Sequence, residues 1–209
     1  MLPLPDTLLL FALHDDKGTV QAAAFLALDH ALRGAALSEL RLKGHVQTRS
    51  SGEFRLHPHP PGRPVEPVLA GTLDALEALD GPCPVSKALD AVQRAIPDIR
   101  DDLVDSLTAR GILREASVER MGLPTDTVHP LANGRVEAAA RSVVRDGLSR
   151  KEAVSPRVGL LIGFVVAAHL EDDLFGDQAD EARELAGWVA ARDSTLRAVR
   201  EAVELVEGW

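Results

Sequence analysis

Arg33 and its neighbour Gly34 are the residues whose types and spacing point most directly to chemistry. A guanidinium donates paired hydrogen bonds to phosphate or carboxylate oxygens, and an adjacent glycine lets a ligand or another backbone come close. Both residues lie in a block, residues 32–46 (LRGAALSELRLKGHV), whose apolar residues recur at helical spacing and whose Gly44 is typical of a helix end. The block predicts a helix with an anion site near its start.

Basic residues are concentrated around this block. Between residues 31 and 63 there are six basic residues and two acidic ones, and Arg41, Lys43 and Gly34 are candidates for auxiliary anion contacts. Between residues 171 and 184 seven acidic residues accompany one arginine. This polarity would orient the protein on an anionic surface. The alternative is that each charge only solvates its own helix.

Composition and periodicity predict a mainly helical fold. The 209 residues suffice for a single domain spanning residues 1–209, and only 3% are aromatic, which favours helices over sheets. Residues 158–170 are apolar all round and predict a buried central helix ringed by amphipathic helices. One small β-hairpin is expected around residues 54–56, and residues 112–129 are expected to be rich in turns and hairpin-like. Helices are expected at residues 3–13, 69–79, 85–95, 98–110, 131–148, 156–170 and, as one or two helices, 180–206, while residues 19–33 form one helix or a strand and a helix.

Net charge and cysteine content exclude several classes of protein. The formal charge of −9 argues against nucleic-acid binding, and the single cysteine, Cys83, fits a reducing compartment and inert packing. Residues 158–170 are shorter than the ~20 residues that a bilayer requires. Acidic Asp6 stands where a signal peptide has its basic leader. We therefore expect a cytoplasmic protein that reaches a membrane only at its surface.

Motifs for catalysis or metal binding are not recognisable. His57 and His59 flank a proline, but no cysteine or acidic residue follows at metal-ligand spacing, which favours a solvated loop. The sequence holds no nucleophile elbow, phosphate-binding loop or dinucleotide fingerprint. We expect no enzymatic activity, no metal and no cofactor.

Four segments carry a resemblance to a known family. Residues 4–18, 32–46, 103–113 and 157–162 read LPDTLLLFALHDDKG, LRGAALSELRLKGHV, LVDSLTARGIL and RVGLLI. In this order they resemble the Golgi phosphoprotein 3 family, whose members bind lipid headgroups at membrane surfaces. The resemblance covers nearly the whole chain and implies a mainly helical, non-catalytic peripheral membrane protein.

The resemblance also implies a headgroup pocket. In the family, one tryptophan and three arginines hold the phosphate of phosphatidylinositol 4-phosphate. Arg33 and Arg100 match two of these arginines, the third falls on Pro97, and the tryptophan falls on Ala24, next to Phe25. Half of the pocket is present, which predicts weak binding of anionic headgroups and reduced selectivity among them.

Two further features set this chain apart from eukaryotic members of the family. Those members carry an apolar hairpin that dips into the bilayer, whereas residues 115–126 are mostly polar here. The excess of arginine over lysine and the high alanine content fit a GC-rich, bacterial genome. The natural ligand would then be another anionic lipid or a protein tail.

Alternative interpretations stay open. Arg33 and Arg100 could be helix-surface arginines that bond Asp29 or Asp102. The chain could be a protein-interaction scaffold, and self-association into a homo-oligomer is not decided. Residues 85–110 followed by a hairpin also resemble a winged helix-turn-helix, but the acidic start of its second helix would repel DNA.

Overall fold

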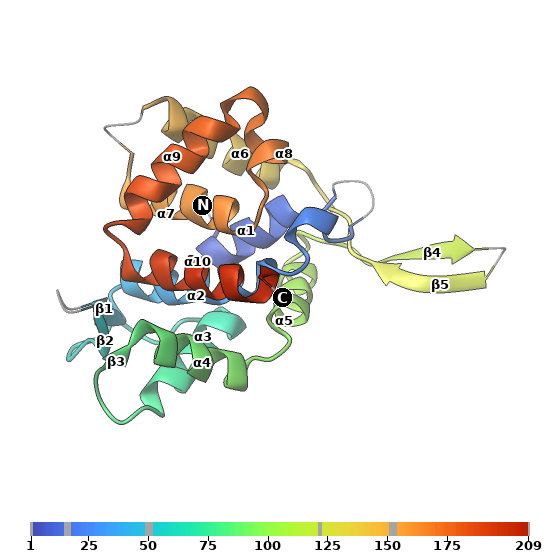
Figure 1. Cartoon of the computed structure of the whole chain (residues 1–209). Coiled ribbons are helices and arrows are strands. Elements are labelled where there is room, and N and C mark those ends of the chain that lie inside the picture. Colours follow the sequence, from blue (N-terminus) through green and yellow to red (C-terminus); the bar gives the residue numbers. More distant parts are fainter. Residues whose placement is uncertain (1, 15–17, 49–51, 121–122, 151–153, 209) are drawn as a thin grey trace.

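Helices α1 (Leu4–Ala12), α2 (Leu28–Leu42) and α7 (Pro156–Ala167) occupy the interior of the molecule (Figure 1). The structure is a computed structural model that describes residues 2–14, 18–48, 52–120, 123–150 and 154–208. All residues of α1 and most residues of α2 and α7 are buried. The predicted buried helix is confirmed, but it shares the centre with α1 and α2.

The other helices surround this centre, and most of them bury one face. In α4, for example, Val85, Ala88 and Val92 are buried, with exposed residues between them. The mainly helical fold class is confirmed. These outer elements are α3 (Pro67–Glu77), α4 (Val85–Ala95), α5 (Ile99–Ala109), α6 (Arg135–Ser149), α8 (Glu171–Phe175), α9 (Ala179–Ala190), α10 (Ser194–Glu207) and the short 3-10 helices η1 (Ala22–Ala24) and η3 (Gly176–Gln178).

Two segments that the sequence left open are now defined. Residues 180–206 form two helices, because the Asp193 side chain accepts hydrogen bonds from the Thr195 and Leu196 N–H groups and so starts α10. After α1, the chain makes a β-bridge between Leu13 and Val20, continues through η1 and a turn, and enters α2 at Leu28. In the described part of the chain, no helix has both the length and the apolar character needed to cross a membrane.

The described strands form two small antiparallel sheets, one at each of the two segments where a hairpin or hairpin-like structure was expected. β1 (Val46–Thr48) pairs with β2 (Glu53–Leu56), and β3 (Cys83–Pro84) adds a third strand through the Phe54–Cys83 pairing. This third strand comes from a distant segment, so local sequence patterns did not reveal it.

The second sheet consists of β4 (Ala116–Arg120) and β5 (Leu123–Val128), which project from the helical body (Figure 1). It lies where the sequence predicted a hairpin-like segment. The side chains of residues 118–126 lie outside the described part of the structure. Whether residues 115–126 touch a membrane therefore stays a prediction.

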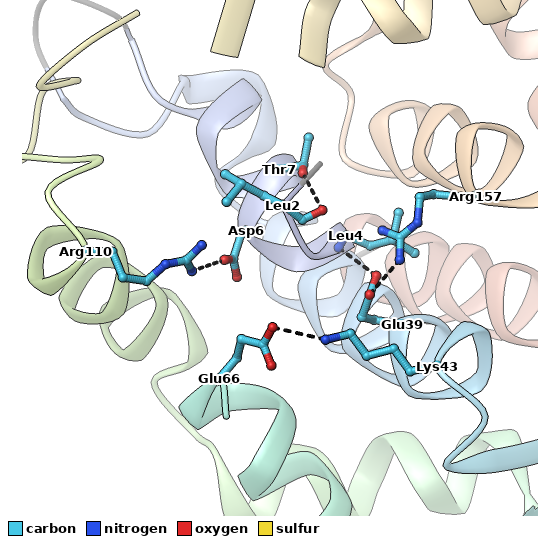
Figure 2. Close-up of polar contacts among 9 residues, drawn as sticks. All are labelled: Leu2, Leu4, Asp6, Thr7, Glu39, Lys43, Glu66, Arg110 and Arg157. Carbon is cyan, nitrogen blue, oxygen red and sulfur yellow. Dashed lines mark hydrogen bonds and ion pairs between the residues drawn. The ribbon is translucent and has the colours of Figure 1, made fainter. Parts of the chain in front are cut away.

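The carboxylate of Glu39 joins the three interior helices (Figure 2). Its side chain, on α2, is only 1% exposed. One oxygen accepts the Leu4 N–H at the start of α1 at 3.0 Å, and the other accepts Arg157 Nη2 at the start of α7 at 2.6 Å. The first N–H groups of a helix lack partners within the helix, so an acceptor from α2 satisfies a group that would otherwise be orphaned.

Two further ion pairs attach outer helices to this centre (Figure 2). Arg110, after α5, bonds the buried carboxyl of Asp6 on α1, and Lys43, after α2, bonds Glu66 before α3 at 3.0 Å. Burial raises the pKa of Asp6 above its ordinary value, although Arg110 opposes this shift. Glu39, Glu66 and Asp6 thus each have a basic partner from another part of the chain.

We predict that Glu39→Ala lowers the free energy of unfolding by about 2–4 kcal/mol, because the Leu4 N–H and Arg157 both lose a buried acceptor. Urea denaturation would measure the change. Glu77→Ala is the control, since Glu77 makes an exposed ion pair with Arg63 and should change stability by less than about 0.5 kcal/mol. Equal effects of the two substitutions would contradict this role of Glu39.

Candidate anion-binding site

Arg33 lies near the start of α2 and is only 6% exposed. Its Nη2 donates to the carbonyl oxygen of Pro97 at 2.8 Å, in the link between α4 and α5. Its Nε is buried without a hydrogen-bond partner among the described residues. Burial lowers the pKa of this guanidinium, and the positive charge of Arg100 lowers it further. Arg33 is therefore a desolvated cation with an unused donor.

Arg100 lies in the first turn of α5, close enough to Arg33 for its charge to affect the pKa of that guanidinium. Its Nε donates to the carboxylate of Asp29, and its Nη2 donates to the Phe25 carbonyl oxygen at 3.1 Å. The guanidinium also stacks on the Phe25 ring, 5.1 Å from its centroid. Of the expected ion pairs, the one between Arg100 and Asp29 is present.

Asp29 interacts with both arginines, through an ion pair with Arg100 and through the effect of its charge on Arg33. It lies one helical turn before Arg33 on α2, and it bonds Arg100 from α5. Its negative charge raises the pKa of Arg33, as does that of Asp98, while Arg100 has the opposite effect. The structure thus brings Arg33 and Arg100 together, with one carboxylate in direct contact with Arg100.

The pKa of His30, next to Asp29, depends on the charges of these residues. Its pKa is lowered first by burial and then by the charge of Arg33, while Asp29 opposes the shift. The imidazole is half-buried. A change in the charge around Arg33 will therefore change the protonation of His30.

The structure does not bring the auxiliary candidates to these two arginines. Arg41 bonds Asp193 at the start of α10, and Lys43 bonds Glu66. At 1.5 Å per residue, Arg41 lies about 12 Å along α2 from Arg33 and Lys43 about 15 Å. Both residues attach α2 to other helices.

Gly34 faces the interior rather than a ligand surface. A Cβ built there would lie 2.3 Å from Val199 Cγ2 and 2.9 Å from Phe164 Cε1. Close packing of α2 against α10 and α7 thus explains the glycine in the middle of a helix.

Ala24 and Pro97, which stand where the family has a tryptophan and an arginine, contribute no side chain to the site. Ala24 is fully buried in η1, whereas the next aromatic residue, Phe25, is 58% exposed. Pro97 contributes its carbonyl oxygen to Arg33 instead of a side chain. Sequence reasoning missed the contact between Phe25 and Arg100, because the two residues are 75 positions apart and no local pattern links them.

The protein is thus a mainly helical domain in which Arg33 and Arg100 lie near each other. The family model for Golgi phosphoprotein 3 (GPP34) matches residues 4–206, and the chain belongs to this family. A comparison with curated proteins gives no match.

We predict that Gly34→Ala destabilises the protein by about 1–3 kcal/mol, because the added methyl group overpacks the contact with Val199 and Phe164. The matched control is Gly187→Ala on α9, where a Cβ meets no described atom within 4 Å. This control should stabilise the helix by up to about 1 kcal/mol. Thermal unfolding of both variants measures the difference, and unchanged stability of Gly34→Ala would argue against the packing role.

Proposed function

We propose that this chain is a non-catalytic peripheral protein that binds the phosphate of anionic phospholipid headgroups at Arg33 and Arg100. The observation that carries the proposal is the proximity of two guanidinium groups from different helices. Arg33 bonds the Pro97 carbonyl just before α5 and keeps an unpaired Nε, while Arg100 in the first turn of α5 bonds Asp29 and lowers the pKa of Arg33 through its charge. Membership of the Golgi phosphoprotein 3 family supports it. The expected place of action is the cytoplasmic face of a membrane.

Asp29 holds the position that a ligand oxygen would take. A carboxylate carries one negative charge, whereas a phosphomonoester carries up to two and offers three acceptor oxygens. The phosphomonoester of a phosphoinositide can therefore displace Asp29 from Arg100, whereas the phosphodiester of phosphatidylglycerol has a single charge, as a carboxylate does, and competes less strongly. We propose that the bound phosphate also accepts from the Arg33 Nε, which is buried in the structure. Charge-assisted hydrogen bonds of this kind contribute about 1.5–3 kcal/mol each.

Two such contacts give weak binding to a single headgroup, because the ordering cost of association consumes much of their energy. A membrane presents many headgroups, so additional attachment to the same surface raises the overall affinity. With Ala24 and Pro97 in place of the tryptophan and third arginine, we propose binding to anionic headgroups in general rather than selective recognition of phosphatidylinositol 4-phosphate. A scaffold that binds protein tails is the alternative, and it predicts no response to lipid charge.

Co-sedimentation with vesicles tests the proposal. We expect binding to rise when phosphatidylglycerol or phosphatidylinositol 4-phosphate is added to phosphatidylcholine vesicles, and the double variant R33Q/R100Q to lose at least tenfold in affinity, about 1.4 kcal/mol. The matched control is R150Q/R192Q, which removes two exposed arginines elsewhere. Equal losses in the two double variants would reduce the effect to net charge and contradict a specific site.

The substitution Asp29→Asn separates a ligand site from a purely structural ion pair. If Asp29 occupies the ligand position, removing its charge frees Arg100 and strengthens binding to anionic vesicles. If Asp29 instead positions Arg100, the variant binds as weakly as Arg100→Gln. Circular dichroism would show that each variant retains its helical fold.

We predict that sulfate raises the pKa of His30. An anion at Arg33 offsets the positive charge that now disfavours the imidazolium, so the charged form becomes more stable. Linkage then requires anion affinity to increase as the pH falls through this range. Titration of the histidine signals by NMR with and without sulfate would measure the shift.

The internal control is His45, whose pKa is lowered by burial and by Lys43 at the other end of α2. It should not respond to sulfate at Arg33. A shift of both histidines, or of neither, would contradict binding at the proposed site.

A further inference from the structure

The turn between η1 and α2 exposes two large apolar side chains. Phe25 is 58% exposed and Leu26 is 57% exposed. Residues 18–28 contain no charged side chain, so this surface has no charge of its own. Single exposed apolar residues are common, but an adjacent pair within an uncharged run indicates an interaction surface.

This turn is held in place on both sides. Gln21 donates from its backbone N–H to the Ala12 carbonyl at 2.8 Å and from its side chain to the Phe11 carbonyl at 3.0 Å. Arg100 holds the other side through the Phe25 carbonyl and ring. Because the backbone is already fixed, Phe25 and Leu26 are presented without a further ordering cost.

The apolar pair lies directly beside the candidate anion site, since the Arg100 guanidinium contacts both Phe25 and Asp29. A surface that delivers phosphate to Arg100 therefore also meets Phe25. At a bilayer surface, phosphate groups lie directly above the hydrocarbon of the acyl chains. A soluble phosphorylated molecule provides a phosphate but no hydrocarbon layer. Aromatic and basic side chains in combination are typical of residues that lie at this interface.

We infer that Phe25 and Leu26 insert into the interfacial layer of the bilayer while Arg33 and Arg100 hold a lipid phosphate. The partner surface is thus an anionic lipid bilayer, which the protein contacts with the end of the molecule that carries η1. This inference rests on the proposed function, because it assumes that the phosphate at the two arginines belongs to a lipid.

The substitution Leu26→Ser tests insertion without disturbing the anion site, because the described bonds of Arg100 go to Asp29 and Phe25. We expect vesicle binding to weaken about fivefold, the loss that follows from withdrawing about half of a leucine side chain from hydrocarbon. The effect of sulfate on His30 should stay unchanged.

The matched control is Val65→Ser. Val65 is 91% exposed and precedes Glu66, which bonds Lys43 just beyond the last residue of α2. It therefore lies near the end of α2 remote from Phe25 and should not affect vesicle binding. Equal binding by Leu26→Ser and Val65→Ser would overturn the inference.

A tryptophan probe measures insertion directly. Phe25→Trp would be introduced together with Trp188→Phe and Trp209→Phe, and quenching by lipids with brominated acyl chains recorded. The control protein keeps Trp188 and carries Trp209→Phe; Trp188 is 57% exposed and stacks with Arg192 at 4.1 Å, on α9. We expect quenching of the Phe25→Trp probe and none of Trp188.

The outcomes separate the two proposals. Retained dependence on lipid charge, with no quenching at position 25 and no effect of Leu26→Ser, would overturn insertion and leave the anion site standing. Loss of binding in Leu26→Ser, with R33Q/R100Q like the unmodified protein, would support insertion and overturn the anion site. Sulfate binding without any vesicle binding would indicate a soluble phosphorylated ligand and overturn insertion.

Discussion

The buried carboxylate of Glu39 is the constraint on which the arrangement of the interior depends. A charge that is 99% removed from solvent is tolerated only when hydrogen-bonded partners surround it, and here those partners begin two other helices. The first N–H of α1 and a guanidinium at the start of α7 must therefore both meet the last turns of α2. This requirement fixes the positions of three largely buried helices along one another.

The same helix carries the polar contacts of the candidate site. Arg33 lies six residues before Glu39, about 9 Å along the axis of α2. Once Glu39 has fixed α2 against α1 and α7, Arg33 points to the α4–α5 link, where the Pro97 carbonyl satisfies one of its donors. The buried Nε that keeps no described partner is a cost to stability. A function that binds anions gives a physical reason for keeping a desolvated, incompletely paired arginine at this position.

Family membership and the local chemistry support different parts of the functional proposal. The match over residues 4–206 establishes the family to which the helical domain belongs. The local chemistry comes from the structure itself, in which the exposed ring of Phe25 stacks on Arg100 next to the buried Ala24. The proposed membrane contact therefore rests on the family for its helical scaffold and on the local geometry of Phe25, Leu26, Arg33 and Arg100 for its details.

The sequence by itself determined the helical class, the buried helix in residues 158–170, the places of both hairpins and the family. These features follow from local periodicity and from turn residues, which act over a few positions of the chain. Only the tertiary structure decided that Glu39 is a buried junction, that Gly34 serves packing, that Cys83 begins a third strand and that Asp29 joins Arg100. Each of these depends on which distant groups come within hydrogen-bonding or van der Waals distance, and no local pattern encodes that. The exposure of Phe25 could not be predicted from the sequence either, because an uncharged segment is compatible with burial in the core and with a position at the surface.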